Sequence, residues 1–192
     1  MNVILASQSP RRRQLLGQMG FTDFQIRPAK GEETADPGLT PDRLVEALSR
    51  RKADEVSAGA GADDLIIAAD TVVSVDGRVL GKPRSREQAA EMLTALSGRE
   101  HTVYTGVTVR RGEQVLTRHE ATRVRFRPLT GQEIAAYVAT GEPMDKAGAY
   151  GIQGRGALLV SGIEGDYFNV VGLPLCLLGQ MLTRFGADPL LL

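Results

Sequence analysis

Two short apolar runs, Val3 to Ala6 and Leu65 to Ala69, constrain the fold of this 192-residue chain more than any other feature. Each run has the length and composition of a buried strand. A helix should follow the first run and another should precede the second, because Ser9-Pro10 and Thr40-Pro41 each place proline at a first helical position. Strands that alternate with helices in this way predict an α/β fold.

The middle of the chain is richer in strands. Asp76-Gly77 lies between valine-rich segments and indicates a hairpin. Polar and apolar residues alternate on both sides of Arg111-Gly112, as they do in antiparallel strands. The expected elements are strands at 2–6, 21–28, 65–69, 101–110, 114–126 and 157–163, helices at 10–19, 41–56, 85–96, 131–139 and 171–185, and a glycine-rich loop at 141–156. We therefore predict one α/β domain over residues 1–192, with a mixed sheet and two lobes around a cleft.

The composition excludes several classes of protein. The chain has 23 Lys and Arg against 23 Asp and Glu, and this balance argues against a general nucleic-acid binder. One cysteine and two histidines exclude an internal disulfide and make a cysteine- or histidine-based metal site improbable. No apolar stretch approaches the about 20 residues that span a bilayer, and the N-terminal run is too short for a signal peptide. We expect a cytoplasmic protein with no membrane partner.

Three arginines, Arg11, Arg12 and Arg13, occupy the first turn of the first predicted helix. Cations are unfavourable there because the N-terminus of a helix already carries a partial positive charge. A bound anion would compensate, and the hydroxyls of Ser7 and Ser9 could join the guanidinium groups in a phosphate or polyphosphate site. The alternative is a solvated basic turn. The chain contains no P-loop motif.

Acidic residues form a second group of candidates. Asp70, followed by Thr71, ends an apolar run, where α/β proteins often place catalytic groups or metal ligands. Glu32 and Glu33 could add oxygen ligands, a set that suits Mg²⁺ or Mn²⁺. The alternatives are an ordinary turn and solvated loop acids.

Two further features point to charge contacts and base recognition. Lys52 and Lys82 are two of only four lysines, and Lys82 lies in the motif Gly81-Lys82-Pro83. Gln153 lies in a segment with five glycines, which let a backbone approach a ligand closely. Its amide offers a donor and an acceptor, as recognition of a base edge requires. Surface lysines and a flexible connector are the alternatives.

The combined motifs resemble the Maf family of nucleoside triphosphate pyrophosphatases over nearly the whole chain. They are Leu5-Ala6-Ser7-x-Ser9-Pro10-Arg11-Arg12, Glu33, Lys52, Ala69-Asp70-Thr71, Gly81-Lys82-Pro83, Leu96-Ser97-Gly98, residues 142–154 (EPMDKAGAYGIQG) and Val171-Gly172-Leu173-Pro174. The resemblance implies an elongated mixed sheet with a central cleft, similar to inosine triphosphate pyrophosphatases, and a homodimer.

The resemblance also implies an activity. The family hydrolyses nucleoside triphosphates to the monophosphate and pyrophosphate with a divalent cation, Mg²⁺ or Mn²⁺. Its general base matches Asp70. Its specificity positions match Arg12, Thr71 and Gln153, a trio similar to the branch that acts on dTTP and UTP, including modified pyrimidine forms. Its phosphate and metal contacts fall on Ser7, Arg11, Glu33, Lys52 and Lys82.

In this interpretation water attacks the α-phosphorus while the cationic side chains stabilise the phosphate charge. Asp70 takes a proton from the water, holds the metal, or does both. The physiological role implied is house-cleaning of nucleotide pools with a link to cell division arrest. The rivals are a nucleotide-binding regulator without catalysis and a phosphatase that releases orthophosphate.

Overall fold

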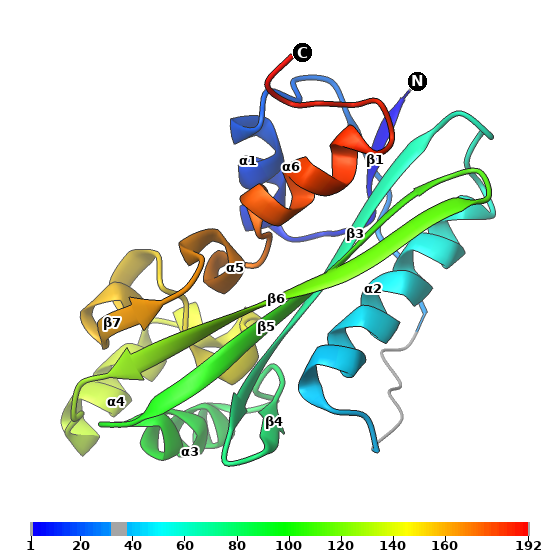
Figure 1. The fold of residues 1–192 in the computed structure, drawn as a ribbon. Helices are drawn as coiled ribbons and strands as arrows, with labels where there is room; N and C mark the ends of the chain where they lie inside the picture. The colour runs from blue at the N-terminus through cyan, green and yellow to red at the C-terminus, as the bar shows by residue number, and fades with distance from the viewer. Residues whose placement is uncertain (1, 32–37, 192) are drawn as a thin grey trace. The chain divides into compact units, whose positions relative to one another are not determined.

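The computed structural model describes residues 2–31 and 38–191, which form a mixed sheet flanked by helices (Figure 1). The strands are β1 (Val3–Leu5), β2 (Gln25–Ile26), β3 (Leu65–Val75), β4 (Arg78–Leu80), β5 (Glu100–Arg111), β6 (Gln114–Phe126) and β7 (Val160–Glu164). The α-helices are α1 (Pro10–Gln18), α2 (Pro41–Ser57), α3 (Arg86–Leu96), α4 (Gly131–Ala139), α5 (Tyr167–Val171) and α6 (Leu175–Thr183). Three short 3₁₀ helices, η1 (Glu142–Asp145), η2 (Ala147–Ala149) and η3 (Gly154–Leu158), separate α4 from β7.

The seven strands form one sheet in the order β2-β1-β3-β5-β6-β7, with β4 paired to β3. Strand β1 is parallel to β2 and β3, whereas β4 is antiparallel to β3 and β7 is antiparallel to β6. The predicted α/β fold with a mixed sheet is therefore confirmed.

Local sequence signals explain several boundaries. The hydroxyl of Ser9 accepts the backbone N–H of Arg12 and caps α1, with Pro10 in the first turn. Asp76 and Gly77 have φ of 51° and 73°, the conformation that a two-residue hairpin turn of type I′ requires, and they join β3 to β4.

Several predicted elements differ from the structure. The strand expected at 21–28 is only the two residues of β2, and the loop expected at 141–156 contains η1 and η2. Strand β3 does not end at Asp70 but runs on to Val75, because the valines that follow pair with β4. The segment before β7 is the 3₁₀ helix η3 rather than strand. The last helix, α6, begins at Leu175 rather than Val171, since Gly172 has φ of 121° and Pro174 is the N-cap, and the short helix α5 before it was not predicted.

The chain divides into two compact units. The first unit comprises Met1–Asp70, Thr105–Glu120 and Gly172–Leu192, and the second comprises Thr71–Tyr104 and Ala121–Val171. In the first unit, apolar residues of α2 pack against β1 and β3. In the second, α3 and α4 pack together over a core that includes Val73 and Phe126. The assignment of the whole chain to one domain, and the central cleft, stay predictions.

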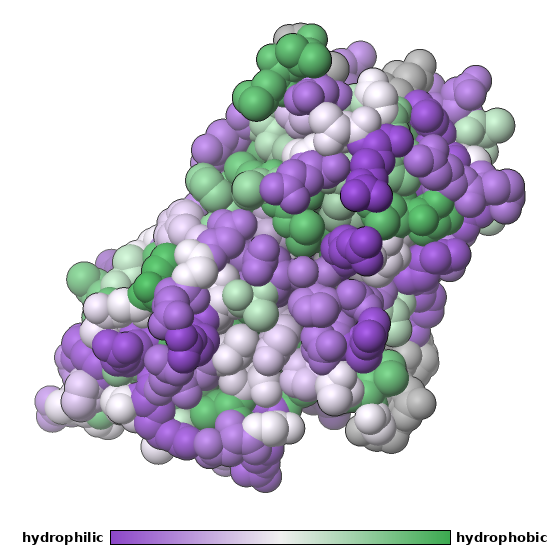
Figure 2. Space-filling view, viewed as in Figure 1, coloured by the Kyte–Doolittle hydropathy of each residue, from purple (hydrophilic) through white to green (hydrophobic). Residues whose placement is uncertain are grey.

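The face of the molecule drawn in Figure 2 is mainly polar. Hydrophilic side chains cover most of this face, and hydrophobic residues form small separate groups on it. Within residues 2–31 and 38–191, no helix is both long enough and apolar enough to cross a bilayer.

A buried histidine makes the stability of the second unit depend on pH. His101 is 3% exposed, its Nε2 lies 2.7 Å from the hydroxyl of Tyr150, and its ring meets Phe126 edge-on. Burial lowers the pKa of His101 to about 4. The unfolded chain takes up this proton near pH 6.5, whereas the folded protein does not until about pH 4.

The contribution of His101 to stability is therefore present above pH 6.5 and is lost as the pH falls toward 4, by up to about 3 kcal/mol. We expect His101→Gln, which keeps a hydrogen-bonding partner for Tyr150, to lose less stability over this range than the wild type. Urea unfolding of both proteins at pH 7.5 and pH 4.5 measures the difference. Equal losses in the two proteins would contradict the assignment.

Candidate active site

A part-buried ion pair joins two of the candidate residues. The ammonium of Lys52, on α2, donates to Oδ1 of Asp70, on β3. Asp70 is 6% exposed, and the side chain of Lys52 is 14% exposed. A carboxylate so far from bulk water needs such a partner. The structure thus brings together two of the predicted site residues, and Asp70 lies within the strand rather than at its end.

Close backbone packing places α2, and with it Lys52, against the sheet. Gly106 of β5 faces the backbone of α2, and a Cβ added to it would lie 2.1 Å from the carbonyl oxygen of Val45. Only glycine permits this approach. A glycine inside a strand often marks a place where another backbone comes close. Gly106 is therefore a structural determinant of the Lys52–Asp70 pair.

The arginine turn leads directly out of β1. The N–H of Ala6 donates to the carbonyl of Ile67, so the chain leaves the sheet beside β3 just before Ser7. Arg12 donates from Nε to the carbonyl of Gly172 at 2.7 Å and from Nη1 to the hydroxyl of Ser7 at 3.3 Å. These contacts orient the guanidinium of Arg12 and join Ser7 to it. Arg11, also half-buried, precedes Arg12 in α1.

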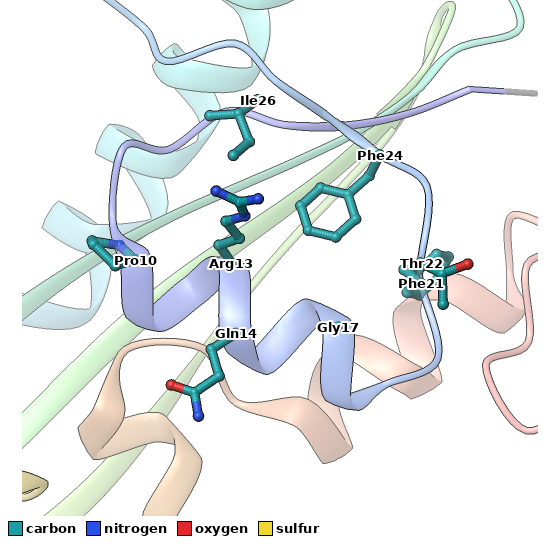
Figure 3. Close-up of a pocket in the computed structure, with 8 residues that line it drawn as sticks. All are labelled: Pro10, Arg13, Gln14, Gly17, Phe21, Thr22, Phe24 and Ile26. Atoms are coloured by element: carbon teal, nitrogen blue, oxygen red, sulfur yellow. The ribbon is translucent and has the colours of Figure 1, made fainter.

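Arg13 is directed elsewhere. Figure 3 shows its side chain pointing toward Phe24 and Ile26, while Gln14 points the opposite way. These residues line a surface pocket of about 470 Å³ beside α1. The three arginines of the first turn therefore do not share one location.

The remaining described candidates lie in the second unit. Thr71 is a half-buried residue of β3, Lys82 is exposed, and Gln153 is half-buried between η2 and η3. Gly148 connects their segments. Its N–H donates to the carbonyl of Gly81, and a Cβ added to it would lie 2.7 Å from a methyl group of Val73. The segment that contains Lys82 and the glycine-rich segment therefore meet beside β3.

Glu33 lies outside the described residues. The segment just before it is attached to α2, because Glu55 accepts the N–H groups of Lys30 and Gly31. Those hydrogen bonds lower the pKa of Glu55. Within residues 2–31 and 38–191, no three or more His, Cys, Asp or Glu side chains are placed to hold a metal ion. The carboxylate of Asp70 suits Mg²⁺, which is often held by one or two carboxylates together with substrate phosphates.

Two structural residues of the site are not among the predicted candidates. The sequence does contain a signal for Gly106, because a glycine inside an alternating strand can indicate close backbone packing. Glu142 lies within the motif that carries the family resemblance, but nothing local to it indicates the contacts of its carboxylate, which come from residues 137, 155 and 156.

Comparison with known proteins agrees with these motifs. Residues 2–185 match the sequence profile described as Maf-like protein. The chain is 58% identical over 189 residues to the dTTP/UTP pyrophosphatase of Moorella thermoacetica, covering 97% of this chain and 96% of that protein. It is 55% identical over 190 residues to the dTTP/UTP pyrophosphatase of Pelotomaculum thermopropionicum, covering 98% of each.

A solved structure shares the fold. The structure of a HAM1 protein from Coxiella burnetii matches with a TM-score of 0.51 and 17% identity, over 96% of this chain and 99% of that one. At this identity the likeness concerns the fold alone. The sequence profile and the two relatives cover almost every described element, so the chain belongs to the family of Maf-like proteins.

Proposed function

We propose that this protein hydrolyses dTTP and UTP, including modified pyrimidine forms, to the nucleoside monophosphate and pyrophosphate. The main support for the proposal is the ion pair of Lys52 with the buried Asp70, because Lys52 orients a carboxylate that can accept a proton. Full-length relatives named for this activity support the substrate class.

In the proposed reaction a water molecule attacks the α-phosphorus, and the bond to the oxygen that bridges the α- and β-phosphorus breaks. Asp70 accepts the proton of the attacking water, and Lys52 holds the carboxylate in place. Arg11, Arg12 and Lys82 would bind phosphate oxygens, where their charge stabilises the transition state and the leaving pyrophosphate. The contacts of Arg12 to Ser7 and Gly172 orient its guanidinium before substrate arrives.

A divalent cation, Mg²⁺ or Mn²⁺, completes the proposal. Asp70, Glu33 and the substrate phosphates would hold it. The bound ion neutralises phosphate charge, which favours attack by water.

Base selection is assigned to Thr71 and Gln153. Uracil and thymine present an N–H donor between two carbonyl acceptors, and a glutamine amide complements one donor and one acceptor. A pocket built on such hydrogen bonds rejects a wrong base more strongly than an apolar pocket does. The homodimer, the cytoplasmic location and the link to cell division arrest stay predictions of the family resemblance.

A substrate panel tests the proposal. The protein is incubated with each of dTTP, UTP, dCTP, CTP, dATP and GTP in Mg²⁺, in Mn²⁺ and in EDTA, and pyrophosphate and orthophosphate are measured separately. We expect pyrophosphate from dTTP and UTP, and none in EDTA. Orthophosphate alone would indicate a phosphatase. Nucleotide binding without either product would indicate a regulator.

Arg12→Ala should impair catalysis more than folding. The variant loses a guanidinium that we propose binds the substrate phosphates and that is only half-buried in the folded protein. We expect kcat/KM for dTTP to fall about a hundredfold, the size of losing a charged hydrogen-bond donor at a reacting phosphate. Steady-state kinetics and thermal unfolding of the same preparation separate the two effects. Arg13→Ala is the matched control and should keep wild-type kinetics. An unchanged kcat/KM in Arg12→Ala would remove this residue from the site.

A further inference from the structure

The carboxylate of Glu142 accepts three hydrogen bonds, two from backbone N–H groups just after Gln153 and one from a side chain of α4. Its Oε1 accepts the hydroxyl of Tyr137 at 2.9 Å and the N–H of Gly156 at 3.0 Å. Its Oε2 accepts the N–H of Arg155 at 3.1 Å. One side chain in η1 therefore connects α4 with the start of η3, directly after Gln153.

The residue two positions before Gln153 is held by the same network. The N–H of Gly151 donates to the hydroxyl of Tyr137 at 3.2 Å, and this hydroxyl in turn donates to Glu142. Tyr137 is buried. The backbone is thus fixed both before and after Gln153 through a single carboxylate.

Glycines allow the segment to close around Glu142. A Cβ added to Gly154, whose φ is +63°, would lie 2.9 Å from the carboxylate of Glu142. A Cβ added to Gly156 would lie 2.0 Å from the carbonyl oxygen of Gly151. Gly154 therefore lets the backbone lie against the carboxylate, and Gly156 lets it lie against Gly151, where side chains would prevent both approaches.

The start of the segment is also constrained. Ala149 is buried with φ of 61°, a conformation that costs a non-glycine residue about 1 kcal/mol. Tyr150 follows it and is packed edge-on against His101 and Phe126. Surrounding contacts must maintain such a backbone, and this is common where a segment presents a recognition group.

The ionisation state of Glu142 agrees with this arrangement. Partial burial raises the pKa of Glu142, but the hydrogen bonds from Gly156, Tyr137 and Arg155 outweigh it, and the net pKa lies below its ordinary value. An ionised carboxylate has only acceptors, as three converging donors require.

We propose that Glu142 is a positioning residue that fixes the backbone on both sides of Gln153 and thereby sets base selection. The inference rests on the proposed function, in which Gln153 reads the pyrimidine. A glutamine amide discriminates between uracil and cytosine only when its orientation is restricted, because a flipped amide exchanges donor and acceptor. Glu142 acts on the substrate through Gln153 and not by direct contact.

Glu142→Gln tests the role with a nearly isosteric change. The amide keeps one acceptor oxygen and places an NH₂ group against a backbone N–H donor, so the network cannot be fully satisfied. We expect the KM for dTTP to rise about tenfold with kcat within about twofold of wild type, and the preference for UTP over CTP to fall by a similar factor. Inhibition by inorganic tripolyphosphate, which has no base, should be unchanged.

Glu133→Gln is the matched control. Glu133 is another hydrogen-bonded carboxylate of the second unit, in the capping box of α4, and it contacts Thr130 and Arg127. This variant should lose stability without a change in KM or in base preference. Tyr137→Phe removes only the hydroxyl that bridges Glu142 and Gly151, and should raise the KM for dTTP by a smaller factor. If Glu142→Gln does not fold, the kinetics of Tyr137→Phe provide the test instead.

The outcomes separate the inference from the proposed function. A wild-type protein that releases no pyrophosphate from dTTP overturns the proposed function. Wild-type turnover, together with unchanged KM and base preference in Glu142→Gln or, if that variant does not fold, in Tyr137→Phe, overturns the role of Glu142 alone. A parallel loss of tripolyphosphate inhibition in the folded variant would also overturn it, since the effect would not be confined to the base.

Discussion

Asp70→Asn is expected to abolish turnover while the protein stays folded. Asparagine has nearly the same shape but cannot accept the proton of an attacking water, so kcat for dTTP should fall by at least about a hundredfold. The amide oxygen can still accept the ammonium of Lys52, which is the contact that Asp70 makes in the structure. The stability loss should therefore stay below the about 3–5 kcal/mol expected when a partner of a buried ion pair is removed outright.

Pyrophosphate release and thermal unfolding, measured on the same sample, check both parts of this expectation. Asp63→Asn is the control, because Asp63 is an exposed aspartate on the loop before β3 and should behave as wild type. An Asp70→Asn variant that releases pyrophosphate at nearly the wild-type rate would show that Asp70 is not the base.

Of the substitutions proposed here, Gly106→Ala is expected to cause the largest loss of stability. The added methyl group would lie 2.1 Å from the carbonyl oxygen and 2.3 Å from the carbonyl carbon of Val45. Both atoms belong to the backbone of α2, so no side-chain rotation can relieve the contact. We expect a destabilisation of about 3 kcal/mol, or a decrease in Tm of about 6–12 °C. Helix α2 must move away from β5, and Lys52 moves with it.

Gly162→Ala provides the comparison for this prediction. Gly162 is also a strand glycine, but a Cβ added to it would have no atom within 4 Å among the described residues. Its Tm should stay close to that of the wild type, and its activity should not change. A similar Tm for Gly106→Ala and the wild type would mean that the close packing of α2 on β5 does not hold in solution.

The elements that follow from local chemistry were predictable from the sequence. The Ser9-Pro10 start of α1 and the Asp76-Gly77 hairpin depend on capping and on positive φ, which particular residues specify. The continuation of β3 through Asp70 and Thr71 was not predictable. A polar pair after an apolar run looks the same at the end of a strand as inside one, and the partner of Asp70 comes from another element, the preceding helix α2.

In the candidate site, too, the residue types could be predicted from the sequence, whereas the contacts between elements could not. The residue types made Asp70, Lys52 and Arg12 candidates and the family resemblance assigned them to the site, whereas the ion pair of Lys52 with Asp70 is seen only in the structure. One partner of Arg12, the carbonyl of Gly172, lies 160 residues away in the sequence and leaves no local signal. The carboxylate of Glu142 likewise receives its donors only once the segment is folded. The catalytic, phosphate-binding and base-reading roles stay predictions.

Hydrolysis of dTTP in ¹⁸O-labelled water tests the central claim most directly. Mass spectrometry of the products shows which phosphorus the water attacked. Attack at the α-phosphorus, as proposed, places one ¹⁸O atom in dTMP and none in the pyrophosphate. Label in the pyrophosphate, or labelled orthophosphate with dTDP, would contradict the proposed reaction.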